Sequence, residues 1–197
     1  MHKKTGGRKK SNTIFLISMF YSMYIFSGEL LSLLPNFLRD VKKLPLDAVG
    51  FASVIVIIPM FLFSMFVGYL VDIHGRKRFL FFAVVGNITV KLLMPHLNTV
   101  TQFYVVFFLF GISELFFWNT INALILDFTV SSADIGKIYF LKDFATLFAP
   151  LMGGIIAQYF SFTQLFYVSS LIVLSSLPFL YGIKERRFQK KPVFRTV

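Results

Sequence analysis

Six apolar segments, each long enough to cross a bilayer as a helix, dominate this sequence of 197 residues. About 20 predominantly apolar residues cross the hydrocarbon core of a membrane in helical form. None of the six segments alternates apolar and polar residues as a strand would, which argues against a membrane β-barrel. We therefore expect an all-α membrane protein with helices over Thr13–Leu38, Ala48–Val71, Phe79–His96, Thr101–Asp127, Lys137–Phe160 and Phe162–Ile183.

The composition agrees with a chain that is solvated by lipid. Hydrophobic residues make up 56% of the sequence and charged residues only 15%, whereas soluble domains carry about a quarter charged residues. The absence of cysteine excludes thiolate metal sites and a cysteine nucleophile, and three histidines are too few for a His-rich metal site. The sequence contains no nucleotide-binding glycine loop and no Ser/His/Asp arrangement. We expect neither an enzyme nor a bound metal or cofactor.

The net charge of +11 is concentrated in two tails. Residues 1–12 and 184–197 each carry +5, and the six-helix bundle over residues 13–183 carries the remaining +1. Such basic tails bind either nucleic acid or the anionic surface of a membrane. Because each tail directly adjoins a hydrophobic helix, we expect anionic lipid at the tails and no nucleic acid.

The distribution of Lys and Arg predicts the orientation of the chain. Six spans place both tails on one side of the membrane, together with Lys137 and the basic run at 76–78, so that this side holds fifteen of the twenty Lys and Arg residues. The opposite side holds only Arg39, Lys42 and Lys43. Basic residues near the ends of spans favour the cytoplasmic side. We expect a multi-pass protein of the plasma membrane with both termini in the cytoplasm.

An acidic residue, Glu114, lies at the middle of the fourth segment. A charge at the centre of a bilayer costs at least roughly 2.5 kcal/mol, so this carboxyl is expected to face a partner or a wet cavity. Trp118 and Asn122 follow at i+4 and i+8 on the same helical face. We predict that these three residues contribute to a substrate or proton-coupling site. The alternative is a neutral glutamic acid that hydrogen-bonds a neighbouring helix.

The first segment carries a stripe of polar residues, Ser18, Ser22, Glu29, Ser32 and Asn36. Their spacing of +4, +7, +3 and +4 places all five on one face of an unbroken helix. A polar face that runs across most of the membrane is typical of a water-lined cavity, which would add Ser22, Glu29 and Ser32 to the candidate site. The alternative is interhelical packing through small hydroxyl groups.

The third and fifth segments contain further exceptions to the apolar pattern. Lys91 lies near the outer end of the third segment, and its long side chain is expected to reach the membrane interface. Pro150 in the fifth segment is followed by Gly153 and Gly154. A proline removes one helical hydrogen bond and glycines allow another backbone to approach, so this stretch is predicted to bend or to pack closely.

The loop between the second and third segments has a recognisable pattern. Residues 68–78 read GYLVDIHGRKR, which closely resembles the signature G-x-L-[AV]-D-x-x-G-R-[KR]-[KR] of the major facilitator superfamily. Residues 149–154, APLMGG, resemble the Gly-Pro-x-x-Gly-Gly element of that family's fifth helix, with Ala149 in place of the first glycine. The resemblance covers all six segments in order.

The resemblance implies roles for particular residues. Asp72 and Arg76, within the signature that also contains Gly68 and Gly75, would form a cytoplasmic charge network with Asp127. We call these five residues the cytoplasmic latch. In the family, the first and fourth helices line the central cavity; here these helices carry Glu29 and Glu114. Transport would proceed by rocking of two six-helix bundles about a central site.

Two departures from the family pattern stand out. Many proton-coupled antiporters of the family have an arginine where this chain has Phe107. The family normally has twelve spans, and this chain has six with a 3+3 repeat expected within them. It therefore resembles one half of such a transporter, either the N-terminal or the C-terminal one. A second half would be supplied by another copy of this chain or by a different chain.

Two functions from different classes follow. The first is a secondary active transporter, or half of one, that moves a small solute across the membrane by alternating access, with proton coupling as an option through Glu114. The second is a membrane protein that does not transport, such as a scaffold, a regulatory subunit or an inert truncated remnant of a transporter.

Overall fold

The computed structural model describes residues 4–129 and 131–184, with side chains from Ser11 onward. The basic side chains of residues 1–10 and of residues 185–197 lie outside this described part. Six helical segments of the described chain are long and apolar enough to span a membrane, which confirms the six predicted spans. No strand occurs in residues 4–129 or 131–184.

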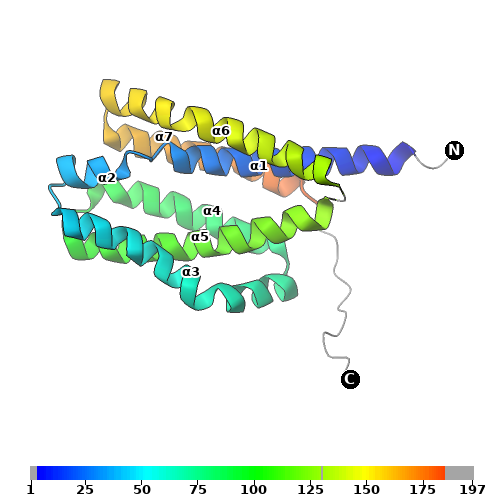
Figure 1. Cartoon of the computed structure of the whole chain (residues 1–197), viewed down its shortest axis with the longest axis horizontal. Helices are drawn as coiled ribbons and strands as arrows, with labels where there is room; N and C mark the ends of the chain where they lie inside the picture. The colour runs from blue at the N-terminus through cyan, green and yellow to red at the C-terminus, as the bar shows by residue number, and fades with distance from the viewer. Residues whose placement is uncertain (1–3, 130, 185–197) are drawn as a thin grey trace.

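The element order is that of an antiparallel helical bundle with short connections (Figure 1). The two ends of the described chain, the start of the first helix and the end of the last, lie at the same end of the bundle (Figure 1). The elements are α1 (Lys4–Glu29), α2 (Leu34–Asn36), the π-helical turn η1 (Phe37–Val41), α3 (Leu46–His74), α4 (Arg76–Leu93), the 3₁₀ turn η2 (Met94–His96), α5 (Val100–Phe128), α6 (Ser132–Tyr159) and α7 (Phe162–Gly182).

Local sequence accounts for where the helices begin. The Thr99 hydroxyl accepts a hydrogen bond from the Gln102 amide, and Gln102 Oε1 accepts one from the Thr99 amide, which is a complete capping box for α5. Ser131 and Ser161 accept from the amides three residues on and cap α6 and α7. Gly75 alone separates α3 from α4, with a φ of 92° that a residue with a Cβ rarely adopts.

The first span differs from the unbroken helix that was expected. The α-helix ends at Glu29, residues 30–33 form turns, and the span continues through α2 and η1. Pro35 explains the break, because proline has no amide hydrogen and its ring clashes with the carbonyl four residues earlier. The prediction of one continuous helix over residues 13–38 is therefore wrong, although the span itself is present.

The helix contacts follow a repeat of three spans plus three. Helix α1 packs most extensively on α6 and α7, and α5 packs in the same way on α3 and α4, while α4 and α7 pack on each other. Exchanging each span with the span three positions later (α1 with α5, α3 with α6, α4 with α7) reproduces these same contacts. This is the internal symmetry expected of a half of a major-facilitator-type fold.

The two largest apolar clusters of the described interior have polar residues between them. One cluster is centred on Phe20, Leu80 and Phe117, and the other on Phe37 and Phe103. On the first span and on α4, α5 and α7, a polar residue falls between the buried residues that join the first cluster and those that join the second. These residues are Ser27, Asn87, Glu114 and Ser169. Together with Tyr24 and Lys91 we call them the polar layer.

Candidate functional site

The carboxylate of Glu114 is the centre of one part of the polar layer. Its Oε1 accepts a hydrogen bond from the Tyr24 hydroxyl at 2.9 Å and another from Asn87 Nδ2 at 3.2 Å. Asn87 Nδ2 also lies 3.0 Å from the Tyr24 hydroxyl oxygen, so the three groups form a closed triangle. Helices α1, α4 and α5 each contribute one member, and any change in the charge of Glu114 therefore acts on all three helices.

Lys91 is the centre of the other part. Its side chain is only 2% exposed, and Nζ donates a hydrogen bond to Ser27 Oγ at 2.5 Å. The expectation that Lys91 reaches the membrane interface is wrong, because Lys91 lies on the same face of α4 as Asn87, which packs against the bundle interior. Lys91 and Glu114 are close enough to interact electrostatically inside the bundle.

Two serines join α1 to α7 beside Lys91. Ser27 Oγ donates to the Ser169 carbonyl oxygen at 2.7 Å, and Ser169 Oγ donates to the Ser27 carbonyl oxygen at the same distance. Both residues are fully buried. Reciprocal bonds of this kind require close backbones, which small side chains allow. Lys91 therefore bonds to a rigid junction between two helices.

The face of α5 that carries Glu114 leaves the polar layer within two turns. Trp118 is partly buried, lies one helical turn from Glu114 and packs edge-on against Tyr21 and Phe117. Asn122, two turns from Glu114, is exposed on the bundle surface. The structure thus brings together Glu114 and Trp118 and leaves Asn122 outside.

The polar stripe expected along the first span is divided by the break after Glu29. Ser22 is buried, and its Oγ has no hydrogen-bond partner among the described residues. Glu29 is the last residue of α1 and is partly buried, whereas Ser32 lies exposed in the turn that follows, as does Asn36 at the end of α2. The expectation of a single continuous polar face is wrong, because the turns at 30–33 change the helical register.

The five residues of the cytoplasmic latch lie at the end of the bundle where α3 meets α4. Arg76 is buried, and its Nε lies 2.8 Å from Asp127 Oδ2 on α5. Its Nη2 is 3.6 Å from Asp72 Oδ1, one turn earlier across the junction. Gly75 provides the sharp turn between them, while a Cβ at Gly68 would meet nothing within 4 Å. The structure therefore joins Asp72, Arg76 and Asp127.

The proline–glycine stretch of α6 marks a close approach between helices. Helix α6 continues through Pro150 without interruption. A Cβ on Gly153 would overlap the backbone of Leu30 in the turn after α1, whereas one on Gly154 would meet nothing within 4 Å. Only the first of the two glycines is required for packing within this bundle.

The sequence reasoning missed Tyr24, Ser27, Asn87 and Ser169 as members of the polar layer. One signal was available on α4, where Asn87 and Lys91 are four residues apart on a face that also carries the small residue Ala83. For the other three, a hydroxyl in an apolar helix gave no indication of a specific partner. Among residues 4–129 and 131–184, no group of three His, Asp or Glu side chains is placed to hold a metal ion.

The comparison with known proteins gives a family for the whole bundle and relatives for part of it. The family model described as Major Facilitator Superfamily matches residues 13–196. Over 153 residues, or 75% of this chain, the sequence is 31% identical to the uncharacterized MFS-type transporter YuxJ of Bacillus subtilis (strain 168), and this region spans only 38% of YuxJ. It is also 29% identical over 112 residues, or 55% of the chain, to the uncharacterized MFS-type transporter YitZ of the same organism, covering 68% of that protein.

Proposed function

The chain belongs to the major facilitator superfamily, and from this premise we propose that it is a secondary active transporter, or half of one, that moves a small solute by alternating access. The family comprises transporters rather than enzymes, and the six apolar spans make the chain an integral multi-pass membrane protein. The proposed location is the plasma membrane, with both termini in the cytoplasm, as the bias of Lys and Arg indicates.

Alternating access in this family needs a second six-helix bundle, which we propose is another copy of this chain or a different chain. The two halves of such transporters are related by an axis along the membrane normal, so that both have the same orientation. The strong charge bias of this sequence makes every copy insert in one orientation. Two copies are therefore compatible with the required parallel arrangement.

The observation that carries the proposal is the polar layer. A carboxylate and an ammonium group are kept in the middle of the bundle, between two apolar clusters, by hydrogen bonds from four different helices. Ionisable groups inside a membrane are costly and mark pathways for substrates or protons. In our proposal, proton or solute binding changes the charge of Glu114 and with it the bonds between α1, α4 and α5. Trp118 completes that site.

The cytoplasmic latch has a complementary role in this proposal. Arg76 joins α4 to α5 through Asp127 and to the end of α3 through Asp72. It would hold the cytoplasmic ends of these three helices together as one rigid unit while the two bundles rock. Breaking the latch would then alter the balance between the inward-open and outward-open states.

A transport assay in reconstituted vesicles tests the proposal. The protein is placed in vesicles with a trapped pH-sensitive dye, and a panel of small solutes is added under an imposed pH gradient. We expect at least one solute to cause proton movement, and Glu114→Gln to abolish it. The matched control is Asp47→Asn, which neutralises an exposed carboxylate in the first turn of α3.

The results distinguish the transporter from the alternative class. Solute-dependent proton movement that persists in Glu114→Gln removes Glu114 from the coupling site. A scaffold or an inert remnant would instead be favoured by three results together. These are the absence of any solute-dependent flux, a stable six-helix monomer in mild detergent, and no ligand-induced thermal shift.

A further inference from the structure

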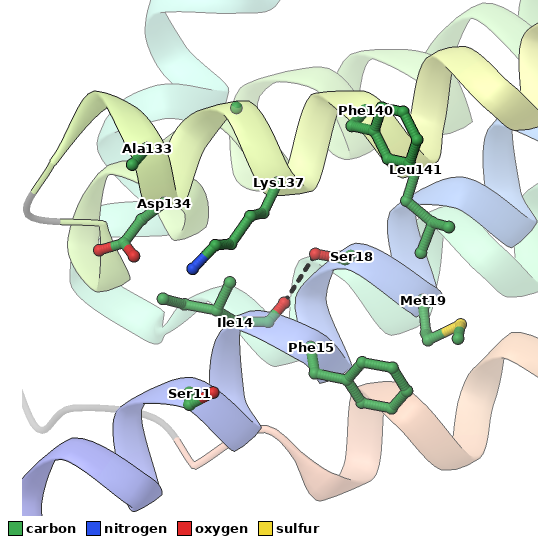
Figure 2. Close-up of a pocket in the computed structure, with 11 residues that line it drawn as sticks. Ser11, Ile14, Phe15, Ser18, Met19, Ala133, Asp134, Lys137, Phe140 and Leu141 are labelled. Atoms are coloured by element: carbon green, nitrogen blue, oxygen red, sulfur yellow. Dashed lines mark hydrogen bonds between the residues drawn. The ribbon is translucent and has the colours of Figure 1, made fainter.

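A groove runs along the outside of α1 beneath α6, starting at the end of the bundle that carries the cytoplasmic latch. Its first part is a cavity of about 710 Å³ between the start of α6 and the neighbouring turns of α1 (Figure 2). A second cavity of about 340 Å³ continues from it and shares the lining residues Met19 and Leu141. Side chains of α1 and α6 line both cavities, and α7 contributes only Ile172, to the second.

The first cavity is the polar end of the groove. Lys137 extends from α6 across the cavity toward α1, and Ser11 and Asp134 lie at the same end (Figure 2). The Ser18 hydroxyl also lines it, but donates to the carbonyl of Ile14 at 2.9 Å. Lys137 is in the second turn of α6. Among the described residues that line this end, Lys137 is the cation and Asp134 the anion, so Lys137 is the group that can bind a phosphate.

The second cavity is the apolar end. Its lining advances along α1 from Met19 to Phe26 and along α6 from Leu141 to Phe148, toward the middle of the membrane, with Ile172 of α7 on the far side. From Ser11 to Phe26 the groove follows about 22 Å of helix at 1.5 Å per residue. Exposed phenylalanines of α6, Phe140 and Phe144, form its outer rim.

We propose that this groove binds one diacyl phospholipid, with its phosphate at Lys137 and Ser11 and one acyl chain along the apolar end between α1 and α6. A cation at headgroup depth that leads into an apolar channel matches the polarity of a phospholipid from phosphate to chain. Asp134 beside Lys137 disfavours a headgroup with a second negative group, so the occupant has a single phosphate. The bound lipid fills the groove between α1 and α6.

Native mass spectrometry of the full chain in mild detergent tests this site. The probe is dioleoylphosphatidylglycerol, titrated into delipidated protein, with dioleoylglycerol as the lipid that lacks the phosphate. We expect one phospholipid adduct per chain at low lipid concentration and no comparable adduct with dioleoylglycerol. Lys137→Gln, which removes the charge and keeps a polar side chain, is expected to reduce adduct occupancy at least fivefold.

Two further variants make the result specific. Lys184→Gln removes an exposed cation at the same end of the bundle, after α7 and outside both cavities, and is expected to leave the adduct unchanged. Leu141→Trp fills the junction of the two cavities while keeping Lys137, and is expected to remove the adduct. A thermal unfolding curve for each variant shows that the fold is retained.

Three results would overturn the proposal. The first is equal occupancy in the wild type and in Lys137→Gln, and the second is equal retention of phospholipid and dioleoylglycerol. The third is that the delipidated wild type is a dimer and that Leu141→Trp converts it to a monomer. That result would assign the groove to a second copy of the chain.

Discussion

Lys91 on α4 and Glu114 on α5 lie in one polar layer, and each is hydrogen-bonded to a different residue of α1. Glu114 accepts from the Tyr24 hydroxyl at 2.9 Å, while Lys91 donates to Ser27 Oγ at 2.5 Å. Tyr24 and Ser27 are three residues apart and so lie on adjacent positions of the same helical face. The first helix therefore connects the anionic and cationic parts of the layer.

This relationship predicts coupling between Lys91 and Glu114. Losing the counter-charge of a buried ionisable group costs up to roughly 3–5 kcal/mol, which is the figure for a direct ion pair. We expect Lys91→Met and Glu114→Gln each to lower the free energy of unfolding by about that amount. The double variant should lose clearly less than the sum of the two single losses, because no charge is then left unpaired. Unfolding in mixed micelles measures all four proteins, and additive losses would contradict the pairing.

The two adjacent glycines of α6 are predicted to differ. Gly153→Ala places a methyl group against the backbone of Leu30, which cannot move aside without separating α6 from α1. Overpacking of this kind typically costs about 1–3 kcal/mol. Gly154→Ala meets open space and is the matched control. Thermal unfolding in detergent should show a lower midpoint for Gly153→Ala alone; equal midpoints would mean that the close approach to Leu30 does not matter.

The two carboxylates around Arg76 are also predicted to differ. Asp127 lies 2.8 Å from Arg76 Nε and its side chain is 18% exposed, whereas Asp72 lies 3.6 Å from Nη2 and is 69% exposed. Solvent-exposed ion pairs are worth only about 0–1 kcal/mol, and truncating a buried pair costs several times more. Asp127→Asn should therefore lower the unfolding midpoint clearly more than Asp72→Asn. The opposite order would assign the main partner of Arg76 to Asp72.

The absence of native cysteine allows a direct test of orientation. Single cysteines at Arg78, beside the latch, and at Lys43, at the opposite end of the bundle, are both at exposed positions. If the basic end is cytoplasmic, a membrane-impermeant maleimide applied to intact cells should label Lys43→Cys but not Arg78→Cys. Both should react after the membrane is permeabilised. Labelling of Arg78→Cys in intact cells would reverse the predicted topology.

The fold was largely predictable because its determinants are local. The length and hydrophobicity of each segment specify a spanning helix, since no other open backbone conformation satisfies its hydrogen bonds in lipid. Gly75, Ser131 and Ser161 mark the ends of helices through their own backbone or hydroxyl chemistry. The exception is the first span, where the polar spacing was treated as continuous although Pro35 interrupts the helix.

The candidate site was predictable only in part. Glu114 stands out in the sequence because a mid-span carboxyl needs a partner, but the identity of that partner depends on how the helices cross. Tyr24 is 90 residues from Glu114 in the chain, and Ser27 is 142 residues from Ser169. Lys91 shows the same limit most clearly. Its position near the end of a span predicted a side chain that reaches the membrane interface, whereas the side chain points into the bundle.

The sequence by itself determined the number of spans, most of their ends, the bias of charge between the two sides and the signature loop. Each of these follows from residues that are neighbours in the chain and from their transfer into lipid. Only the tertiary structure decided that Lys91 and Glu114 share one layer, that Gly153 but not Gly154 faces a backbone, and that a groove runs between α1 and α6. These depend on the rotation and crossing of whole helices, which arise from packing over the entire bundle.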